Sequence, residues 1–368
     1  MIYDFLVVGG GIAGSSAAYA LADHGSVLLL EAESITGFHA TGRSAALFTR
    51  NFGGPVVRQI NASSVEFFRS PPEGFSDSPL LTPRGCLTVA TPGREEDLDA
   101  LLAMSVPGEE ICPIEPTEAC EMVPFLRPEH VGRAVFEANV ADIDVAILQM
   151  SYLKGARARG AIIKTKQPVT ALSWHADVWT TQTASDSFSA VTVVNAAGAW
   201  ADQIGQMAGA HPIGLVPKRR TGIIINAPDG IDCGALPAID FTGCDAYIKP
   251  EAGKLMASPG DATPTEPHDA WPDDMDIAVL ADWIQRETTI KIRKIEHSWA
   301  GLRSFVVDEI PVVGLDAKAR NFFWLAGQGG YGIMMAPVLA ALAAEQCTAG
   351  SGPLMDQFAQ ALSPERLL

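Results

Sequence analysis

The chain has 368 residues and a formal net charge of −17. Because such an acidic protein repels phosphate groups, we expect neither nucleic-acid binding nor docking to an anionic membrane surface. A hydrophobic content of 48 % with only 19 % charged residues excludes intrinsic disorder. At roughly 150 residues per domain, the length predicts two to three domains with cores large enough to fold without metal or disulfide support.

The predicted elements begin with a strand over residues 3–8, a glycine-rich turn over 9–14, a helix over 15–22 and a second strand over 26–31. The strands are short and apolar, as buried parallel strands are, and the helix is rich in alanine. Together they form a complete β-α-β unit of about thirty residues.

After this unit the order of elements is less regular. We predict helices over 55–68, 95–104, 117–123, 145–159 and 274–287, with a last helix that ends near Cys347. Strands are predicted over 85–90, 161–164, 190–194 and 322–326. A run of strands separated by turn residues fills 215–258, and no internal repeat is present.

The six cysteines give no metal or redox signature. They are Cys86, Cys112, Cys120, Cys233, Cys244 and Cys347. No pair has the C-x-x-C spacing of a zinc or thiol-redox site, so we expect reduced thiols and no metal centre. No apolar run reaches the roughly 18 residues of a membrane-spanning helix, and the first apolar residues lead into glycines rather than a signal-peptide cleavage site. The expected location is the cytoplasm.

The glycine turn carries the strongest chemical signal. Gly9 permits a tight turn, Gly11 lets the backbone approach a pyrophosphate, and Gly14 allows helix and strand to pack closely. Glu31 follows Gly9 by 22 residues at the end of the second strand, the place of an acid that accepts a hydrogen bond from a ribose hydroxyl. This combination predicts dinucleotide binding, and the Glu31 charge disfavours NADP. A second glycine-rich turn at 327–332 favours a nucleotide domain assembled from distant segments.

Several motifs taken in order resemble one known family. They are Gly9 to Gly14 with Glu31, the segments 41–46, 195–200 and 299–303, the segment 310–314, and the segment 329–332. The chain is similar along its whole length to the FAD-dependent amine and amino-acid oxidoreductases, a group that includes D-amino-acid oxidase, glycine oxidase and sarcosine oxidase. Residues 37–46, 217–220, 247–250 and 329–333 most resemble bacterial D-arginine dehydrogenases and their relatives.

The resemblance implies an α/β fold with a discontinuous, Rossmann-like FAD-binding domain. The expected segments of this domain are 1–80, 143–213 and 302–368. An inserted α+β substrate domain, built on a mixed and mainly antiparallel sheet, is expected at 81–142 and 214–301. The residues that would bind FAD are Gly9, Gly11, Ile12, Ala13, Gly14, Glu31, Ala32, Thr41, Arg43, Ser44, Ala45, Ala46, Val169, Ala197, Gly198, Trp200, Gly301, Arg303, Gly329, Gly330, Tyr331, Gly332 and Ile333.

The reaction that the resemblance implies is hydride transfer from a substrate Cα–H to the flavin, giving an imine that water hydrolyses to a 2-oxo acid and ammonia. Arg220 and Arg303 match the family's carboxylate-binding positions, and a guanidinium suits a carboxylate because it donates two parallel hydrogen bonds. Tyr247 matches a tyrosine whose hydroxyl helps to hold the carboxylate, and Gly330 a position whose carbonyl faces the substrate amine. Strand alternation directs Arg219 to the face opposite Arg220.

Four positions depart from the arginine-preferring relatives. Cys86 stands where they carry a Glu, Leu47 replaces a His, Phe52 replaces a lid Tyr, and Met334 replaces a Gln. Because burying a guanidinium among such groups costs several kcal/mol, the sequence favours a D-amino acid with an uncharged, hydrophobic side chain. An N-alkyl or cyclic imino acid, or a glycine- or sarcosine-like amine, is the alternative substrate.

Two features concern the flavin itself. His39, followed by Ala-x-Gly, has the spacing of a histidine that binds flavin covalently in relatives that oxidise dimethylglycine, yet the D-arginine dehydrogenase relatives share it and bind FAD noncovalently. We expect noncovalent FAD. Oxygen-reactive sarcosine oxidases place a Lys near the flavin, whereas the segment 254–258 puts an apolar residue there, with Lys254 close by. We therefore expect a dehydrogenase that passes electrons to a quinone or similar acceptor.

Three other functions compete with this interpretation. A 2-hydroxy-acid dehydrogenase would need a histidine base near the arginines, and none is evident. A sarcosine-like oxidase would differ in oxygen reactivity, and a non-catalytic flavoprotein subunit would have lost the arginine clamp. Because the whole chain repels anions, the substrate carboxylate must be attracted locally, by Lys218, Arg219, Arg220 and Arg303 converging on one pocket.

Overall fold

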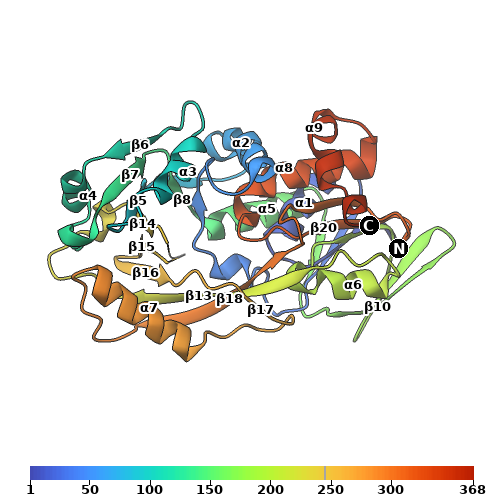
Figure 1. Cartoon of the computed structure of the whole chain (residues 1–368). Helices are drawn as coiled ribbons and strands as arrows, with labels where there is room; N and C mark the ends of the chain where they lie inside the picture. The colour runs from blue at the N-terminus through green and yellow to red at the C-terminus, as the bar shows by residue number, and fades with distance from the viewer. Residues whose placement is uncertain (244–245) are drawn as a thin grey trace.

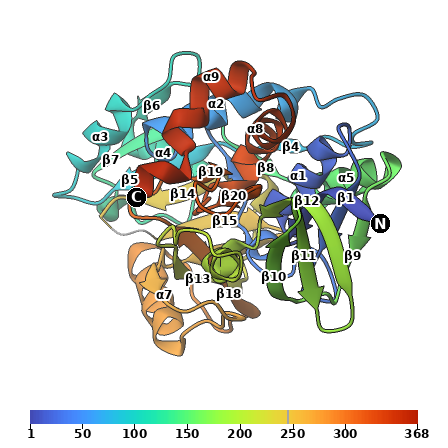
Figure 2. The same ribbon diagram turned by 90° about the vertical axis from the view of Figure 1, so that its right-hand side faces the viewer.

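The computed structural model describes residues 1–243 and 246–368, so Cys244 lies outside the described residues. The described chain forms two large sheets with helices packed around them (Figure 1). Figure 2 shows β13, β18 and α7 in one group and β10, β11 and β12 in another, so the two sheets lie beside each other. The fold class expected from the sequence, α/β with mixed sheets, is confirmed.

The first sheet contains the predicted β-α-β unit. Its strands, in sheet order, are β10 (Val169–His175), β11 (Val178–Thr183), β12 (Ser187–Asn195), β1 (Ile2–Val8), β2 (Val27–Leu30) and β9 (Ile162–Lys164), with β20 (Phe322–Ala326) beside β12 and β19 (Val312–Leu315) beside β20. Strands β12, β1, β2 and β9 are parallel. Helix α1 (Ile12–Leu21) joins β1 to β2 as the alanine-rich sequence predicts.

This sheet is buried on both faces, which explains why its strands are apolar runs rather than alternating patterns. One face packs on α1 and on α8 (Gly332–Ala344), with Val7, Leu29 and Leu339 in a shared core. The other face carries Leu6, Leu28 and Trp324. The carboxyl ends of β1, β12 and β20 lead into the three glycine-containing turns that the sequence singled out.

The second sheet comes from residues 86–137 and 216–305. Its order is β17 (Thr263–Pro264), β13 (Val216–Ile225), β16 (Lys254–Ser258), β15 (Tyr247–Glu251), β14 (Ala238–Phe241), β5 (Cys86–Ala90), β7 (Arg133–Glu137) and β6 (Ile111–Ile114), with β18 (His297–Phe305) also paired to β13. Most pairs are antiparallel, and β14 with β5 is parallel. A small sheet joins β3 (Leu47–Phe48), β8 (Ala141–Ile143) and β4 (Leu81–Pro83). The domain boundaries drawn from the sequence stay a prediction.

Helix α7 (Asp274–Glu287) covers the outer face of the second sheet (Figure 1). Its Leu280 and Ile284 pack with Ile223 and Ile225 of β13. Since side chains alternate along a strand, Arg220 and Gly222 point to the inner face. That inner face is where the second sheet contributes to the cavity described below.

The remaining helices are α2 (Pro55–Arg69), α3 (Asp97–Ala103), α4 (Pro116–Met122), α5 (Val145–Ala158), α6 (Ala201–Met207) and α9 (Pro353–Leu362). The sequence did not predict α6, α9 or the β10–β11 hairpin. Among the described residues no single helix is both long and apolar enough to cross a membrane, and one pair bent by 98°, Gly332–Thr348 with Pro353–Leu367, passes that test only jointly.

Candidate functional site

The first glycine turn is closely packed at the ends of β1 and β12. Gly9 has a φ of +103°, and a Cβ there would lie 2.5 Å from the Ala196 carbonyl oxygen. A Cβ at Gly14 would lie only 1.9 Å from the Gly9 carbonyl oxygen. A Cβ at Gly11 would meet only the Thr41 hydroxyl, at 3.2 Å. The turn and the start of α1 therefore need glycine at 9 and 14 for backbone packing, whereas Gly11 leaves room on its open side.

The segment that follows β2 is held against this turn. Glu31 is buried, and its carboxylate accepts hydrogen bonds from the Gly10 N–H at 2.7 Å and the Glu33 N–H at 2.8 Å. The Thr41 hydroxyl accepts the Ile12 N–H at 2.9 Å, satisfying one free donor at the start of α1. Glu31 and Thr41 are thereby fixed at the rim of one cavity.

This cavity has a volume of about 420 Å³ and runs from the glycine turns to the second sheet. Most of the FAD-binding residues predicted from the sequence line it: Gly9, Gly11, Ile12, Ala13, Glu31, Ala32, Thr41, Arg43, Ser44, Ala45, Val169, Ala197, Gly198, Trp200, Gly301, Arg303, Gly329, Gly330, Gly332 and Ile333. Gly14, Ala46 and Tyr331 are not among the lining residues. Gly14 instead packs on Gly9, and Tyr331 packs on Phe52 with ring centroids 5.1 Å apart.

The cavity fits a dinucleotide. The close packing at Gly9 and Gly14 keeps side-chain atoms away from the turn, where a pyrophosphate would meet backbone N–H groups. The side-chain nitrogen of Gln328, another lining residue, is buried without a hydrogen-bond partner among the described residues. A buried donor without a partner costs free energy, which a polar ligand in this cavity would recover.

Arg220, Arg303 and Tyr247 all line the same cavity. In the β13–β18 register Arg220 pairs with Gly301, two residues from Arg303, so the two guanidinium groups start as diagonal neighbours on one sheet face. Burial raises the pKa of Tyr331, while the charges of Arg303 and Arg220 both lower it. Both arginines are thus close to one phenol on the inner face.

Of the four basic residues expected to converge on one pocket, Arg220 and Arg303 line the cavity, and Lys218 and Arg219 do not. Arg219 points away, as alternation predicts, and its guanidinium binds Asp276 on α7 at 2.7 Å. The Lys218 ammonium pairs with Glu309 at 3.4 Å and lies 4.7 Å from the centre of the Phe305 ring. Neither residue lines the cavity, because acidic partners outside it hold both side chains.

Arg43 has a structural contact that the sequence did not reveal. Its guanidinium donates to the Ala300 carbonyl at 2.8 Å and to the Ala270 carbonyl at 3.1 Å, and it pairs with Asp269. The segment after β2 is therefore tied to β18 of the second sheet. His39 also lines the cavity, with its ring nitrogen 3.0 Å from a Glu33 carboxylate oxygen.

The four residues predicted to shape the substrate side-chain pocket lie outside the lining of this cavity. Leu47 packs on the buried Cys86. Met334, on α8, is buried in the core, and Phe52 is half exposed against Tyr331. Their roles toward a substrate stay a prediction. Met256 does line the cavity, while Lys254 is turned to Glu296, at 3.4 Å.

Acidic groups surround Cys86, which changes the expectation of a wholly apolar pocket. Its thiol donates to the Asp240 carboxylate at 3.6 Å, and its register partner on β7 is Glu137. Burial raises the pKa of Asp240 to about 6, against the thiol hydrogen bond that lowers it, and the Glu137 charge raises it further. The sequence missed Asp240 because β14 reaches β5 from about 150 residues away.

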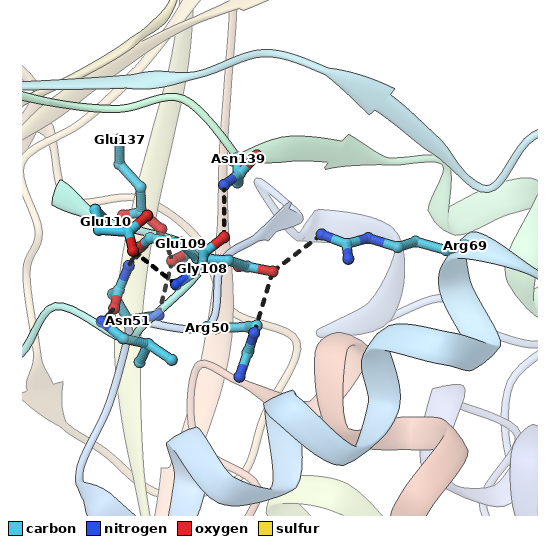
Figure 3. Close-up of polar contacts among 10 residues, drawn as sticks. Arg50, Asn51, Arg69, Gly108, Glu109, Glu110, Glu137 and Asn139 are labelled. Carbon is cyan, nitrogen blue, oxygen red and sulfur yellow. Dashed lines mark hydrogen bonds and ion pairs between the residues drawn. The ribbon is translucent and has the colours of Figure 1, made fainter.

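Glu137 belongs to a network that anchors the segment before α2 (Figure 3). Its carboxylate accepts from the Thr49 hydroxyl at 2.5 Å and the Asn51 amide at 2.9 Å. The buried Glu109 accepts from Arg69 at 2.9 Å and lies 3.4 Å from Arg50. Burial raises the pKa of Glu137, whereas the bonds from Thr49 and Asn51 lower it.

Asp240 should make stability depend on pH. The folded state keeps its proton up to a pKa of about 6, whereas the unfolded chain releases it near 3.8, so wild-type stability falls as pH rises through this window. Asp240→Asn removes this titration. We expect its Tm to exceed that of the wild type by a few degrees at pH 8 and by much less at pH 4.5, in thermal melts of the holoprotein. A difference independent of pH would contradict the assigned pKa.

Several lining residues had no signal in the sequence. Gln167, Met207 and His268 come from loops and a helix end that form the wall only in the folded chain. Gln328, by contrast, stood within a recognised motif, the glycine-rich turn after β20. No group of three or more His, Cys, Asp or Glu side chains suited to a metal ion occurs among the described residues.

The chain matches the family model described as FAD dependent oxidoreductase (DAO) over residues 4–346. Human mitochondrial dimethylglycine dehydrogenase is 27 % identical over 356 residues, which cover 90 % of this chain and 41 % of that protein. The chain thus spans less than half the length of this relative. Glycine oxidase of Bacillus licheniformis is 26 % identical, with 99 % and 97 % of the two chains covered.

Solved structures show the same fold. Glycine oxidase from Geobacillus kaustophilus superposes with a TM-score of 0.82 at 23 % identity, covering 94 % of each chain. L-Proline dehydrogenase from P. horikoshii superposes with a TM-score of 0.84 at 22 % identity, covering 99 % of this chain and 97 % of that one.

Proposed function

The chain belongs to the DAO family of FAD-dependent oxidoreductases, which act on amines and amino acids, and from that premise we propose that it oxidatively deaminates a D-amino acid. The observation that carries the proposal is the placement of Arg220, Arg303 and Tyr247 in one cavity with the dinucleotide turn. A buried carboxylate needs such donors, because it loses its hydration and nothing else would replace those hydrogen bonds.

The protein would hold the cofactor with the turn at 9–14, Glu31 and the second glycine turn at 327–332. When bound, FAD supplies the acceptor for the hydride that leaves the substrate Cα. The two guanidinium groups orient the carboxylate so that one face of Cα is presented, which is how a rigid site gains rate. The imino acid that results is hydrolysed by water to a 2-oxo acid and ammonia.

No side-chain base is part of this proposal. Hydride loss requires a neutral substrate amine, and release of its proton to solvent suffices. The two lining histidines have other partners: the His39 ring pairs with Glu33, and the His268 ring pairs with the Glu266 carbonyl. This disfavours a 2-hydroxy-acid dehydrogenase, which needs a base for the hydroxyl proton.

Noncovalent FAD is part of the proposal. Acid denaturation of the purified protein should release the flavin into the supernatant. A yellow pellet would instead assign a covalent bond to His39, and His39→Ala would then free the flavin.

For the electron acceptor we propose a quinone or a similar carrier. The resemblance places the lysine of the oxygen-reactive relatives in the segment 254–258, from which the apolar Met256 lines the cavity, and Lys254 is paired with Glu296. Rapid formation of peroxide during turnover in air would contradict this assignment.

The side chain of the substrate is proposed to be uncharged, with an apolar stem. Leu47 and Met334, two positions that the resemblance assigns to the substrate side chain, are apolar. The Asp240 carboxyl favours a polar group at the far end of that side chain. D-Arginine turning over better than every neutral D-amino acid would contradict an uncharged side chain.

The test follows bleaching of the visible flavin band under anaerobic conditions. The panel contains D- and L-amino acids, N-methyl amino acids and 2-hydroxy acids. We expect reduction by D-amino acids and slow or no reduction by the other classes. Preferential reduction by N-methyl amino acids would support the sarcosine-like alternative, and no reduction by any amino acid would refute the proposal.

A further inference from the structure

Asp240 stands beside the cavity without a strong partner of its own. It lies on β14 directly opposite Tyr247 of β15, so both side chains project from the same face of the sheet. Tyr247 lines the cavity. Asp240 is accessible to solvent, yet protein surrounds its carboxyl closely enough to raise its pKa. Both observations hold for a side chain that faces a recess inside the molecule.

Four buried acids, unlike the solvent-accessible Asp240, have strong donors. Glu31 accepts from two backbone N–H groups, Glu109 from Arg69, and Glu137 from Thr49 and Asn51. Asp316 accepts from the Trp324 indole and three backbone N–H groups. For Asp240 the described donor is one thiol, a weak donor, at 3.6 Å.

This contrast indicates that the missing donor arrives with a ligand. A carboxylate that faces a recess and has one thiol as its described donor is otherwise solvated by water alone, so it is available to a donor on a ligand. The neighbouring acid does not relieve it, since the Glu137 charge repels that of Asp240.

We propose that Asp240 is a specificity residue, which accepts a hydrogen bond from an N–H group at the far end of the substrate side chain. The proposal rests on the proposed function, because the carboxylate end of the same substrate is assigned to Arg220 and Arg303. In sheet order Arg220 on β13 and Asp240 on β14 are three strand spacings apart, roughly 14 Å between backbones. Both side chains project from the same face of the sheet, and this separation suits an amino acid whose extended side chain reaches from one to the other.

The N–H donor can come from a neutral amide-like group or from a cation. D-Citrulline and D-arginine are near-isosteric and represent these two sources. D-Norleucine has a comparable apolar stem and no donor. The L isomers of all three are measured in parallel, so that an error in the proposed chirality leaves the comparison intact.

The experiment measures the anaerobic rate of flavin reduction, divided by the dissociation constant of each amino acid, in the holoprotein. We expect the wild type to favour the better of the two donor substrates over norleucine by about 10- to 100-fold, the effect of one charge-assisted hydrogen bond. Asp240→Leu, which has a similar volume and no acceptor, should remove this preference while norleucine is reduced as before. Faster reaction with citrulline identifies a neutral partner. Faster reaction with arginine identifies a cationic partner, which keeps the role of Asp240 and contradicts the uncharged side chain proposed above.

Glu137→Gln is the matched control, because it removes one charge from the same pair of acids and keeps an oxygen for Thr49 and Asn51. It should preserve the preference. Two results would overturn the role of Asp240 and leave the proposed function standing. In the first, norleucine reduces the wild-type flavin as fast as either donor substrate does. In the second, Asp240→Leu leaves the preference for the donor substrate unchanged. No reduction by any of the amino acids would refute the proposed function itself.

Discussion

Arg220→Met is expected to lower anaerobic flavin reduction by the substrate about 10²- to 10³-fold while FAD stays bound. Methionine keeps the apolar stem and removes the donors that would face the substrate carboxylate. The carboxylate would then be desolvated with one arginine instead of two, and Cα would no longer be oriented. Stopped-flow absorbance measures the reduction rate, and the flavin spectrum measures retention of the cofactor.

Arg219→Met is the matched control for this variant. It removes the same side chain one residue earlier, on the face where Asp276 holds it. We expect its reduction rate to stay within about threefold of the wild type, although losing this partly buried ion pair lowers the Tm. Equal rates for Arg220→Met and the wild type would remove Arg220 from the site. An equal loss in both variants would show a general effect of charge.

Gly14→Ala is expected to abolish recovery of folded, FAD-bound protein. Its Cβ would stand 1.9 Å from the Gly9 carbonyl oxygen, so either α1 or the turn must move, and the dinucleotide cradle moves with it. Yield of soluble protein and the ratio of flavin to protein absorbance measure the effect. Gly54→Ala is the control, since no atom lies within 4 Å of its added Cβ and its φ of −67° suits alanine.

Gly11→Ala separates a ligand role from a packing role. Its Cβ meets only the Thr41 hydroxyl at 3.2 Å, so the fold should survive, but a methyl group at this place would fill space that a pyrophosphate needs. We expect a folded protein whose FAD affinity is at least about tenfold weaker. Unchanged FAD affinity would contradict the placement of the pyrophosphate at this turn.

Local spacing explains what the sequence predicted well. The strand, turn, helix and acid from Tyr3 to Glu31 are neighbours in the chain, and their interactions with one another form the unit. Arg219 and Arg220 were assigned to opposite faces by alternation alone, and Asp276 confirms the outward direction of Arg219. The pairing of Arg220 with a carboxylate depended on family resemblance, because nothing in the local sequence distinguishes it from Arg219.

Long-range pairing explains what the sequence missed. Asp240 comes beside Cys86 through a parallel pair of strands, so residue types near Cys86 in the chain suggested an apolar pocket. The β10–β11 hairpin turns at Ala176 and Asp177, which have φ values of 50° and 60°, where such a turn usually shows a glycine. Lys218 was assigned to the pocket because its partner Glu309 lies 91 residues further along the chain.

The measurement that tests the account most directly compares a free carboxylate with its neutral counterpart. Holoprotein is mixed anaerobically with D-leucine and, separately, with D-leucinamide, and loss of the visible flavin band is followed over time. Two arginines and a tyrosine that hold the substrate carboxylate predict bleaching by D-leucine at least about 100-fold faster than by the amide. Equal bleaching by both would contradict the carboxylate clamp, and with it the assignment of Arg220 and Arg303.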